Sequence, residues 1–223
     1  MAHTNFEPLS GDDGLNEVAC VCIGAGRFLR AVLIPAIEAS AMGTTILAQP
    51  RGTSFVRSVQ ATNGSYEVDT VNFDGSVVTT RHSVAAVGTL GTPEGLKAFL
   101  ALPARLPKLK IVGVGVTEAG VALGSDAMRA LALFLAACGA AGRGALSIIN
   151  TDNVPGNGDA VRRFCLEALP ADRPGARLYV AEMVTFHNTM VDRITAHRPG
   201  DPLVPSAELL PPKALVIEDL EGV

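Results

Sequence analysis

A short apolar run, Val18–Ile23, leads directly into a Gly-x-Gly turn and then into a segment with helical periodicity. A run rich in β-branched residues is typical of a buried strand in a parallel sheet, and the apolar pattern of residues 27–39 indicates a helix. A strand, a glycine turn and a helix together present free backbone N–H groups to a phosphate at the helix N-terminus. In this arrangement Gly24 would allow the tight turn, and Gly26 would let the backbone approach a pyrophosphate.

The glycine turn differs from the usual dinucleotide-binding pattern, because Leu29 stands where a third glycine is expected. A bare Gly-x-Gly is also found in ordinary β–α turns, so both interpretations stay open. The next predicted strand, Thr44–Gln49, ends without the acid that would bind a ribose 2′-OH. Arg51 follows it, and an arginine there accommodates a 2′-phosphate, which favours NADP(H). The alternative is an exposed loop arginine.

The composition limits the class of protein. Hydrophobic residues make up 48% of the chain and charged residues 18%, which predicts a buried core and excludes disorder. The net charge of −4 gives no electrostatic signal for nucleic acid or for an anionic membrane. Residues 1–17 are polar and lack the pattern of a signal peptide. We therefore expect a cytoplasmic protein that binds neither nucleic acid nor membrane.

No spacing of metal-binding residues is present. Cys20 and Cys22 would share one strand face, and with Cys138 and Cys165 they are predicted to be reduced thiols. The chain has no His-x-x-x-His or Cys-x-x-Cys pair, so no metal site is predicted. The absence of Gly-x-Ser-x-Gly and of a Walker-type loop excludes the common hydrolases and the P-loop proteins.

Strands and helices alternate along most of the sequence. Asp74-Gly75 separates two β-rich runs, 66–73 and 76–83, and predicts a hairpin closed by a type I′ turn. Thr92 predicts the N-cap of a short helix, and Ser125 or Asp126 that of a longer one. Further strands are predicted at 110–116, 145–149, 177–184 and 214–217, and a further helix at 159–169. The predicted fold class is α/β, a doubly wound, mostly parallel sheet with an inserted antiparallel β-hairpin.

Polar residues gather after three of the predicted strands, at 117–118, 150–157 and 187–192. Ligands of open α/β sheets bind beyond the carboxyl ends of the strands. Side-chain amides there would hold substrate hydroxyls or polarise a carbonyl group. The alternative for residues 150–157 is an Asx-turn followed by a helix cap, since Asn and Asp favour turns for local reasons.

Four motifs follow one another along the chain: Gly-Ala-Gly-Arg-Phe-Leu-Arg at 24–30, Val-Thr-Glu-Ala-Gly at 116–120, Asp-Asn-Val-Pro-Gly-Asn-Gly at 152–158 and Asn-Thr-Met-Val-Asp-Arg-Ile-Thr at 188–195. In this order they resemble the long-chain polyol dehydrogenases, a family that includes mannitol 2-dehydrogenase and fructuronate reductase. The resemblance extends from about residue 18 to residue 219. It implies a Rossmann-like dinucleotide-binding domain over residues 18–223, after the polar lead-in of residues 1–17.

The resemblance also implies roles for individual residues and a cofactor, NAD or NADP. The turn formed by Gly24, Gly26, Arg27 and Phe28 would bind the pyrophosphate. Asn153 is similar to the family's amide that polarises the substrate carbonyl, and Glu118 to a glutamate on its proton-exit route. Val191 and Asp192 resemble a segment that lines the nicotinamide and substrate pocket.

One departure from the family concerns catalysis. The catalytic lysine of the family lies in a helical C-terminal domain, after a Val-Ile-Glu-Asp segment that ends here at Asp219, four residues before Val223. The expected function is an NAD(P)-dependent oxidoreductase, or its cofactor-binding half, that interconverts mannitol and fructose or mannonate and fructuronate. We expect it to be inactive without a C-terminal domain or partner chain, and to expose an apolar surface where that part would pack. The alternative is a non-catalytic nucleotide-binding module.

Overall fold

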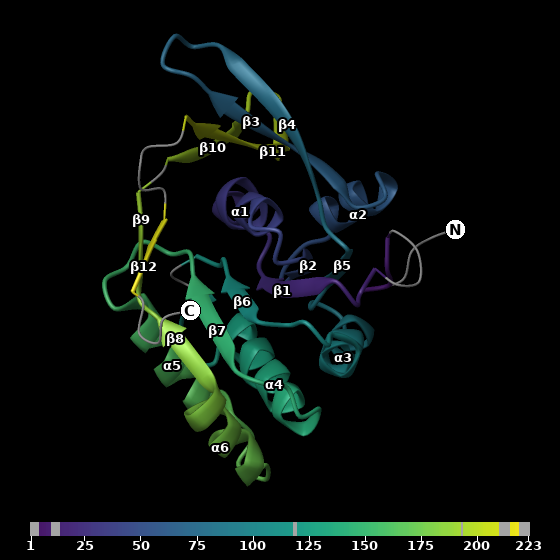
Figure 1. The fold of residues 1–223 in the computed structure, drawn as a ribbon, viewed down its shortest axis with the longest axis vertical. Helices are drawn as coiled ribbons and strands as arrows, with labels where there is room; N and C mark the ends of the chain where they lie inside the picture. Colours follow the sequence, from purple (N-terminus) through teal and green to yellow (C-terminus); the bar gives the residue numbers. More distant parts are fainter. Residues whose placement is uncertain (1–4, 10–13, 118–119, 193, 210–214, 219–223) are drawn as a thin grey trace.

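A six-stranded parallel sheet forms the centre of the protein. The computed structural model describes residues 5–9, 14–117, 120–192, 194–209 and 215–218. In the sheet the strands lie in the order β5-β2-β1-β6-β7-β8, and every neighbouring pair is parallel (Figure 1). From β1 the sheet continues through β2 to β5 on one side, and through β6 and β7 to β8 on the other, as in doubly wound sheets. The strands are Val18–Ile23 (β1), Thr44–Gln49 (β2), Ala86–Thr89 (β5), Ile111–Val114 (β6), Leu146–Asn150 (β7) and Val184–His187 (β8).

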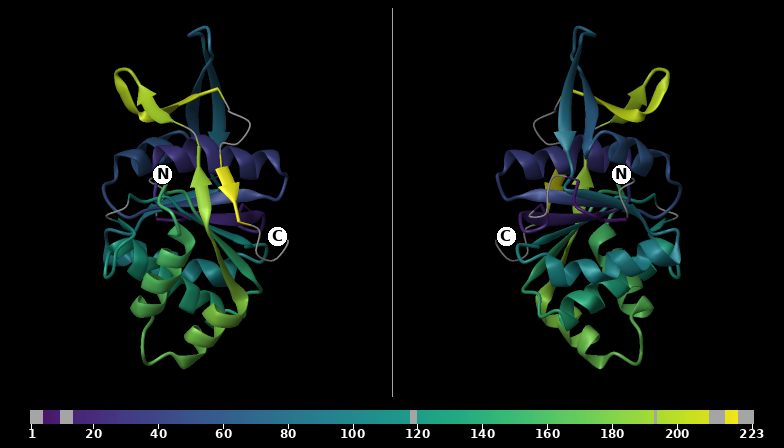
Figure 2. Two further views of the ribbon diagram at one scale, coloured as in Figure 1. Left: turned by 90° about the vertical axis from the view of Figure 1, so that its left-hand side faces the viewer. Right: turned by 90° about the vertical axis from the view of Figure 1, so that its right-hand side faces the viewer.

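Helices cover both faces of this sheet (Figures 1 and 2). On one face lie a helix that begins at Arg27, with a π-helical turn at Leu29–Leu33 before Ile34–Ala39 (α1), and Ser54–Ala61 (α2). The other face carries Pro93–Ala101 (α3), Asp126–Ala140 (α4), Asn157–Ala168 (α5) and Pro174–Met183 (α6). Each face of the sheet packs against its helices through its own apolar cluster. The strands are buried on both sides, and this is why they are continuous apolar runs.

A second sheet lies beyond α1, at the top of Figure 1. Its order is β10-β11-β3-β4, and it contains the predicted hairpin, Ser65–Val71 (β3) and Val77–Ser83 (β4). The other two strands are Thr195–Arg198 (β10) and Asp201–Glu208 (β11), of which β11 runs parallel to β3. A two-stranded pair, Thr189–Val191 (β9) and Leu215–Ile217 (β12), lies between the two sheets, at the left of Figure 1. The predicted fold class is confirmed.

The hairpin turn is not the predicted type I′ turn. The N–H of Gly75 donates to the carbonyl of Asn72 (2.9 Å), and Asn72 also pairs with Ser76 (2.8 Å). The loop is therefore three residues long, and of these only Gly75 has a positive φ, +82°. A three-residue loop places its one left-handed residue last, so the glycine of Asp74-Gly75 marked the turn but not its length.

The prediction of a strand at residues 177–184 is wrong, because most of this segment belongs to α6. Pro174 supplies the fixed φ that suits a first helical turn, and Ala176, Tyr179 and Val180 are buried at helical spacing. The sequence interpretation also missed α2, β5, β8, β9, β10 and β11. Phe6, within the predicted lead-in, is buried and donates its N–H to the carbonyl of Val87 (3.2 Å), so this residue belongs to the core.

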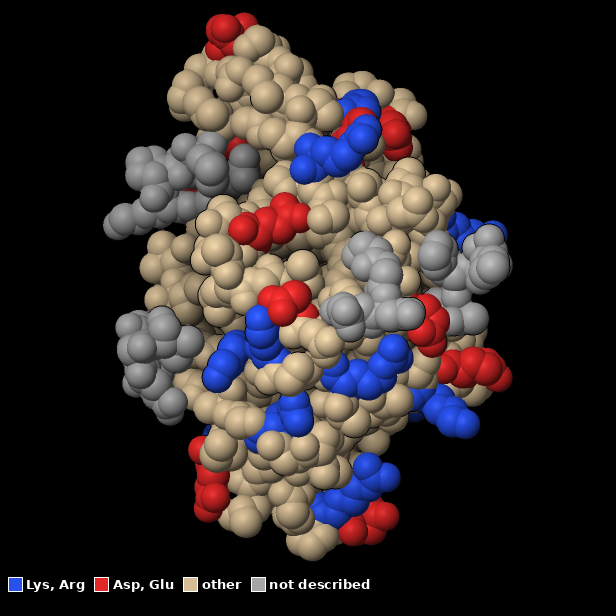
Figure 3. All heavy atoms as spheres, turned by 45° about the vertical axis from the view of Figure 1, so that its right-hand side comes forward, with Lys and Arg blue, Asp and Glu red and all other residues tan. Residues whose placement is uncertain are grey.

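No helix that the structure describes is long and apolar enough to cross a membrane. On the face drawn in Figure 3, Lys and Arg side chains are interspersed with Asp and Glu.

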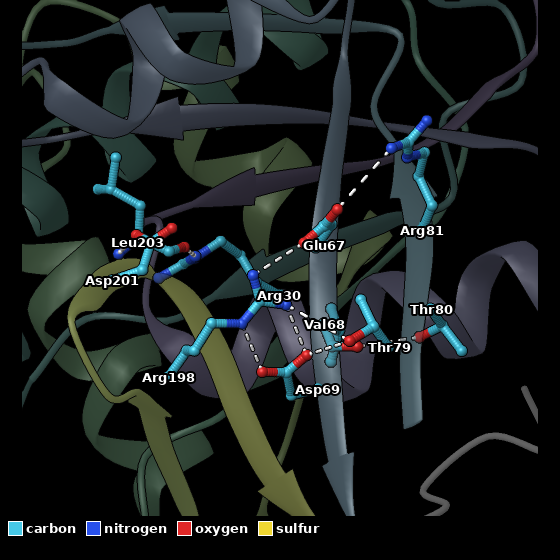
Figure 4. A network of polar contacts seen from close by, with 10 residues as sticks. All are labelled: Arg30, Glu67, Val68, Asp69, Thr79, Thr80, Arg81, Arg198, Asp201 and Leu203. Atoms are coloured by element: carbon cyan, nitrogen blue, oxygen red, sulfur yellow. Dashed lines mark hydrogen bonds and ion pairs between the residues drawn. The ribbon is translucent and has the colours of Figure 1, made fainter. Parts of the chain in front are cut away.

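An ion-pair ladder ties the second sheet together (Figure 4). Arg198 on β10 donates two hydrogen bonds of 2.7 Å to Asp69 on β3, and its third nitrogen lies 3.0 Å from Glu67. Thr79 on β4 donates to the same Asp69 carboxylate (2.7 Å). These contacts with Arg198 hold the pKa of Asp69, whose side chain is 5% exposed, below its usual range.

Replacing Asp69 by asparagine is expected to lower the free energy of unfolding by about 2 kcal/mol at pH 7, since charge-assisted hydrogen bonds are lost. The pKa of Asp69 is lower in the folded chain than in the unfolded one. Its contribution is therefore complete above the unfolded pKa near 4 and is lost as the pH falls through the folded value. Thermal melts at pH 7 and pH 3 test this, and the difference from wild type should shrink at pH 3. Glu17→Gln, which removes an exposed pair with Lys108, is the control and should cost less than about 0.5 kcal/mol.

Candidate functional site

A hollow lies at the carboxyl edge of the parallel sheet, where β1 and β6 are neighbours and the strand order reverses. Its walls are the loop after β1, the end of β2 with Pro50 and Arg51, the loop after β6 and the start of α4. Its volume is about 280 Å³. In open α/β sheets this crevice at the reversal of strand order is the place where ligands bind.

Three glycines bring the walls of the hollow close together. Gly24 has a φ of +114°, and a Cβ atom on it would lie 2.2 Å from the carbonyl oxygen of Gly115, the residue that follows β6. A Cβ on Gly26 would lie 3.1 Å from the same oxygen. Only glycine fits at Gly24, because both the backbone angle and the space exclude a side chain. The tight turn that the sequence predicts at Gly24 is therefore present, and the role of Gly24 and Gly26 in binding a pyrophosphate stays a prediction.

The loop after β1 lacks the third glycine of the usual pattern, and Gly115 provides the space for close packing instead. A Cβ on Gly115 would lie 2.1 Å from Cδ1 of Leu29, so the leucine occupies space that the glycine leaves free. In the usual fingerprint the third glycine allows close packing of helix on strand. Here the neighbouring strand carries the small residue, and the helix carries the large one.

The helix that follows the glycine loop begins with two of the predicted cofactor-binding residues, Arg27 and Phe28. Arg27 is exposed, and its Nη1 lies 3.4 Å from Nδ1 of His197 on β10. The first N–H groups of a helix have no partners within it, and together with the helix dipole they favour an anion. An arginine at this position adds a full positive charge to that end.

Arg30 holds the glycine loop from behind, and the sequence interpretation did not single it out. Its side chain donates through Nε to the carbonyl of Ala25 (2.9 Å) and through Nη1 to the carbonyl of Leu203 on β11 (Figure 4). The guanidinium lies 4.4 Å above the ring of Phe55, and the residue is only 4% exposed. Burial lowers the pKa of Arg30 to about 10, which leaves it charged at neutral pH. One available signal was this lone charge inside an apolar helical segment.

The two other polar segments, at 150–157 and 187–192, are brought together by hydrogen bonds of Asn157 and Thr189. Asn157 donates through Nδ2 to the carbonyl of Asp152 (2.6 Å) and to Oγ1 of Thr189 (2.8 Å), and its Oδ1 accepts from the Thr189 N–H (2.9 Å). The hydroxyl of Thr189 donates to the carbonyl of Asn150 (2.6 Å). Asn157 thus holds the loop after β7 against β9.

Part of the segment 150–157 makes local turns, as the alternative interpretation expected. The N–H of Asp152 donates to Oδ1 of Asn150 (3.3 Å), the pattern of an Asx-turn. The buried Nδ2 of Asn150 has no hydrogen-bond partner among the residues described. Asn157 does not cap α5 with its side chain, because Gly156 occupies the N-cap.

Three of the remaining predicted site residues belong to these two segments. Asn153, in the loop after β7, and Asp192, directly after β9, are both exposed, and Val191 is half-buried on β9. Arg51 is exposed at the end of β2. Glu118 lies outside the described residues.

His187 has a structural environment. It is 2% exposed, and its Nδ1 donates to the carbonyl of Glu218 (2.8 Å), since a carbonyl only accepts. Its Nε2 then accepts from the hydroxyl of Ser147 (3.1 Å). These bonds tie β8 to β7 and to the end of β12.

Cys20 and Cys22 are buried with their Sγ atoms 3.8 Å apart, and Cys138 and Cys165 are also buried and free. Among the described side chains, no group of three or more His, Cys, Asp or Glu residues could hold a metal ion.

A parallel sheet in this order, with a glycine loop where the order reverses, is the arrangement of a dinucleotide-binding domain. The sequence profile of the mannitol dehydrogenase Rossmann domain matches residues 18–219. The chain belongs to this family. Membership confirms the resemblance inferred from the sequence motifs and supports the predicted cofactor class, NAD or NADP.

Solved structures show the same fold at low sequence identity. D-sorbitol dehydrogenase in substrate-free form has a TM-score of 0.72 and 19% identity, covering 93% of this chain and 51% of its own. Pseudomonas fluorescens mannitol 2-dehydrogenase, in a ternary complex with NAD and D-mannitol, has a TM-score of 0.73 and 20% identity. The match covers 96% of this chain and 51% of that protein. An octopine dehydrogenase is more distant, with a TM-score of 0.52 and 11% identity. The match covers 89% of this chain and 42% of that protein. The chain thus spans about half the length of the two polyol dehydrogenases. No curated protein matched the sequence.

Proposed function

We propose that this chain is the cofactor-binding part of an NAD(P)-dependent oxidoreductase. The reaction would transfer hydride between the cofactor and a polyol/ketose pair such as mannitol and fructose, or a sugar-acid pair such as mannonate and fructuronate. The observation that carries the proposal is the glycine-walled hollow at the reversal of strand order, in a chain whose family match spans residues 18–219. The nicotinamide ring supplies or accepts the hydride, and this chain binds and orients.

The loop after β1 is the part of the chain proposed to bind the pyrophosphate. Gly24 and Gly26 let the loop lie against the backbone of Gly115, and the helix start at Arg27 and Phe28 would offer N–H groups to the phosphate oxygens. Arg27 adds a positive charge. The end of β2, with Arg51, would face the adenosine end of the cofactor.

The segments at 150–157 and 187–192 are proposed to face the substrate. Asn153 would donate a hydrogen bond from its amide to the substrate carbonyl oxygen, and Val191 and Asp192 would line the pocket beside the nicotinamide. The Asn157–Thr189 bonds support this, because they fix the two loops against each other. Glu118 is proposed, from the family resemblance alone, to lie on the proton-exit route.

Oxidation of an alcohol needs a base to accept its proton, and the resemblance implies that the family's lysine lies in a helical C-terminal domain, beyond the Rossmann domain matched here. We propose that a C-terminal half, in the same polypeptide or in a partner chain, supplies the base. An apolar groove of about 960 Å³ between α1, the β3–β4 hairpin and β12 would be its docking surface. Met42, Val216 and Ile217 line this groove and are more than a third exposed, so a second half would cover apolar surface there. Solved relatives twice as long as this chain support that occupant.

A second candidate function is a non-catalytic nucleotide-binding module, since the family match covers a cofactor-binding domain alone. Calorimetric titration of the purified chain with NADH and NADPH tests binding, and calorimetry suits a chain without tryptophan. We expect binding of at least one nucleotide and no turnover of mannitol, fructose, mannonate or fructuronate by this chain alone. No affinity for either nucleotide would contradict both functions. A native polypeptide heavier than 23.0 kDa would favour the oxidoreductase, and one of this mass the module.

A further inference from the structure

The residues at the end of β2 determine whether a ribose 2′-OH or a ribose 2′-phosphate fits the hollow. In this chain they carry an amide and a guanidinium. Gln49 is the last residue of β2, and both Gln49 and Arg51 line the hollow. In NAD-binding domains an acid near this point accepts a hydrogen bond from the ribose 2′-OH, and that acid would repel a 2′-phosphate. Among the described lining residues the one acid is Asp126, on the first turn of α4 rather than on β2.

Gln49 is fixed in place, with one acceptor left over. Its Nε2 donates to the carbonyl of Arg51 (2.6 Å), and its own carbonyl accepts from the N–H of Leu90 (2.8 Å). Its side-chain Oε1 is buried and has no partner among the described residues. Because this oxygen is closed to solvent, a ligand in the hollow does not reach it. Gln49 therefore contributes a neutral side chain at the position where NAD-binding domains carry an acid.

Arg51 is exposed, and no carboxylate of the described chain pairs with it. The Gln49 bond to its carbonyl, together with the left-handed φ of +74° at Gly52, sets the course of the turn that carries it. A guanidinium binds phosphate through paired N–H donors, and the binding is strongest where no acid competes.

We propose that this site selects NADP(H) over NAD(H): Arg51 binds the ribose 2′-phosphate, and Gln49 stands where an acid would repel that phosphate. The proposal rests on the proposed function, because it concerns the adenosine end of the same site. It adds a choice of cofactor that the family match leaves open.

Dissociation constants measured by calorimetry test this choice, with NADPH, NADH, and the fragments adenosine 2′,5′-bisphosphate and AMP as probes. Wild type should bind NADPH, and the bisphosphate, at least tenfold more tightly than the partner without the 2′-phosphate. Arg51→Gln should weaken NADPH at least tenfold and change NADH less than twofold. Gln49→Glu should weaken NADPH and strengthen NADH, because the carboxylate accepts from a 2′-OH and repels a phosphate.

Arg129→Gln is the matched control, since Arg129 is an exposed arginine of α4 that does not line the hollow. It should change both dissociation constants less than twofold. NADH binding as tight as NADPH in wild type, or equal losses for both nucleotides in Arg51→Gln, would overturn the cofactor choice and leave the proposed function standing. Failure of wild type to bind either nucleotide would overturn the proposed function and this choice with it.

Discussion

Alanine at Gly24 is expected to abolish measurable nucleotide binding and to lower the free energy of unfolding by about 3 kcal/mol or more. The added Cβ would lie 2.2 Å from the carbonyl oxygen of Gly115, and the φ of +114° disfavours any side chain. Relief of this clash would require the loop after β1 to move away from β6. That movement would open the cradle in which the pyrophosphate is proposed to lie. Calorimetric titration and thermal melts measure the two effects.

Gly142→Ala is the control for Gly24→Ala. Gly142, after α4, also has a positive φ, +64°, but a Cβ there would meet nothing within 4 Å. Its cost should be about 1 kcal/mol, from backbone strain alone, with nucleotide binding unchanged. If both variants melted alike and bound nucleotide like wild type, the close approach of Gly24 to Gly115 would have no role in the site.

Methionine at Arg30 is expected to weaken nucleotide binding at least tenfold. The variant loses the bonds to the carbonyls of Ala25 and Leu203, so the glycine loop is no longer tied to β11. Two opposing terms set the change in stability. Lost hydrogen bonds destabilise the fold, while removal of a buried charge relieves a desolvation cost, so we expect a net loss of about 1 to 2 kcal/mol.

Arg30→Lys separates the charge of Arg30 from its geometry. Lysine keeps the positive charge but lacks the planar fork that reaches both carbonyls, so its binding should be closer to that of Arg30→Met than to wild type. Titration of both variants with NADPH and NADH provides the measurement. Binding by Arg30→Met at wild-type strength would show that the loop holds its shape without this side chain.

The central sheet was largely predictable, because strands buried on both faces are continuous apolar runs. Val18–Ile23 and Thr44–Gln49 were predicted with the bounds that the structure shows. Strand β11 was not predicted, since Pro202 and Pro205 mask it and its partner β3 lies more than 130 residues earlier in the chain. The segment of α6 was predicted as a strand because it contains β-forming residues. Its buried residues follow helical spacing instead.

The site was predictable only where it follows local sequence. The loop at Gly24 and the arginine at position 51 can be recognised from a strand, a turn and the end of the next strand. The role of Gly115 could not be recognised, because it depends on contact with Gly24, far away in the sequence. Arg30 gave a signal as a charge within an apolar segment, but its contact with Leu203 could not be predicted from local sequence. The roles of Gly24 and Arg51 in binding the cofactor stay predictions, as do those of the other predicted site residues.

Hydrogen–deuterium exchange of the chain, with and without saturating NADPH, tests most directly where the nucleotide lies. We expect protection at residues 24–28, 49–52 and 125–128, three segments that contain residues lining the hollow. Unchanged exchange at all three segments, or protection confined to the apolar groove between α1 and β12, would contradict it.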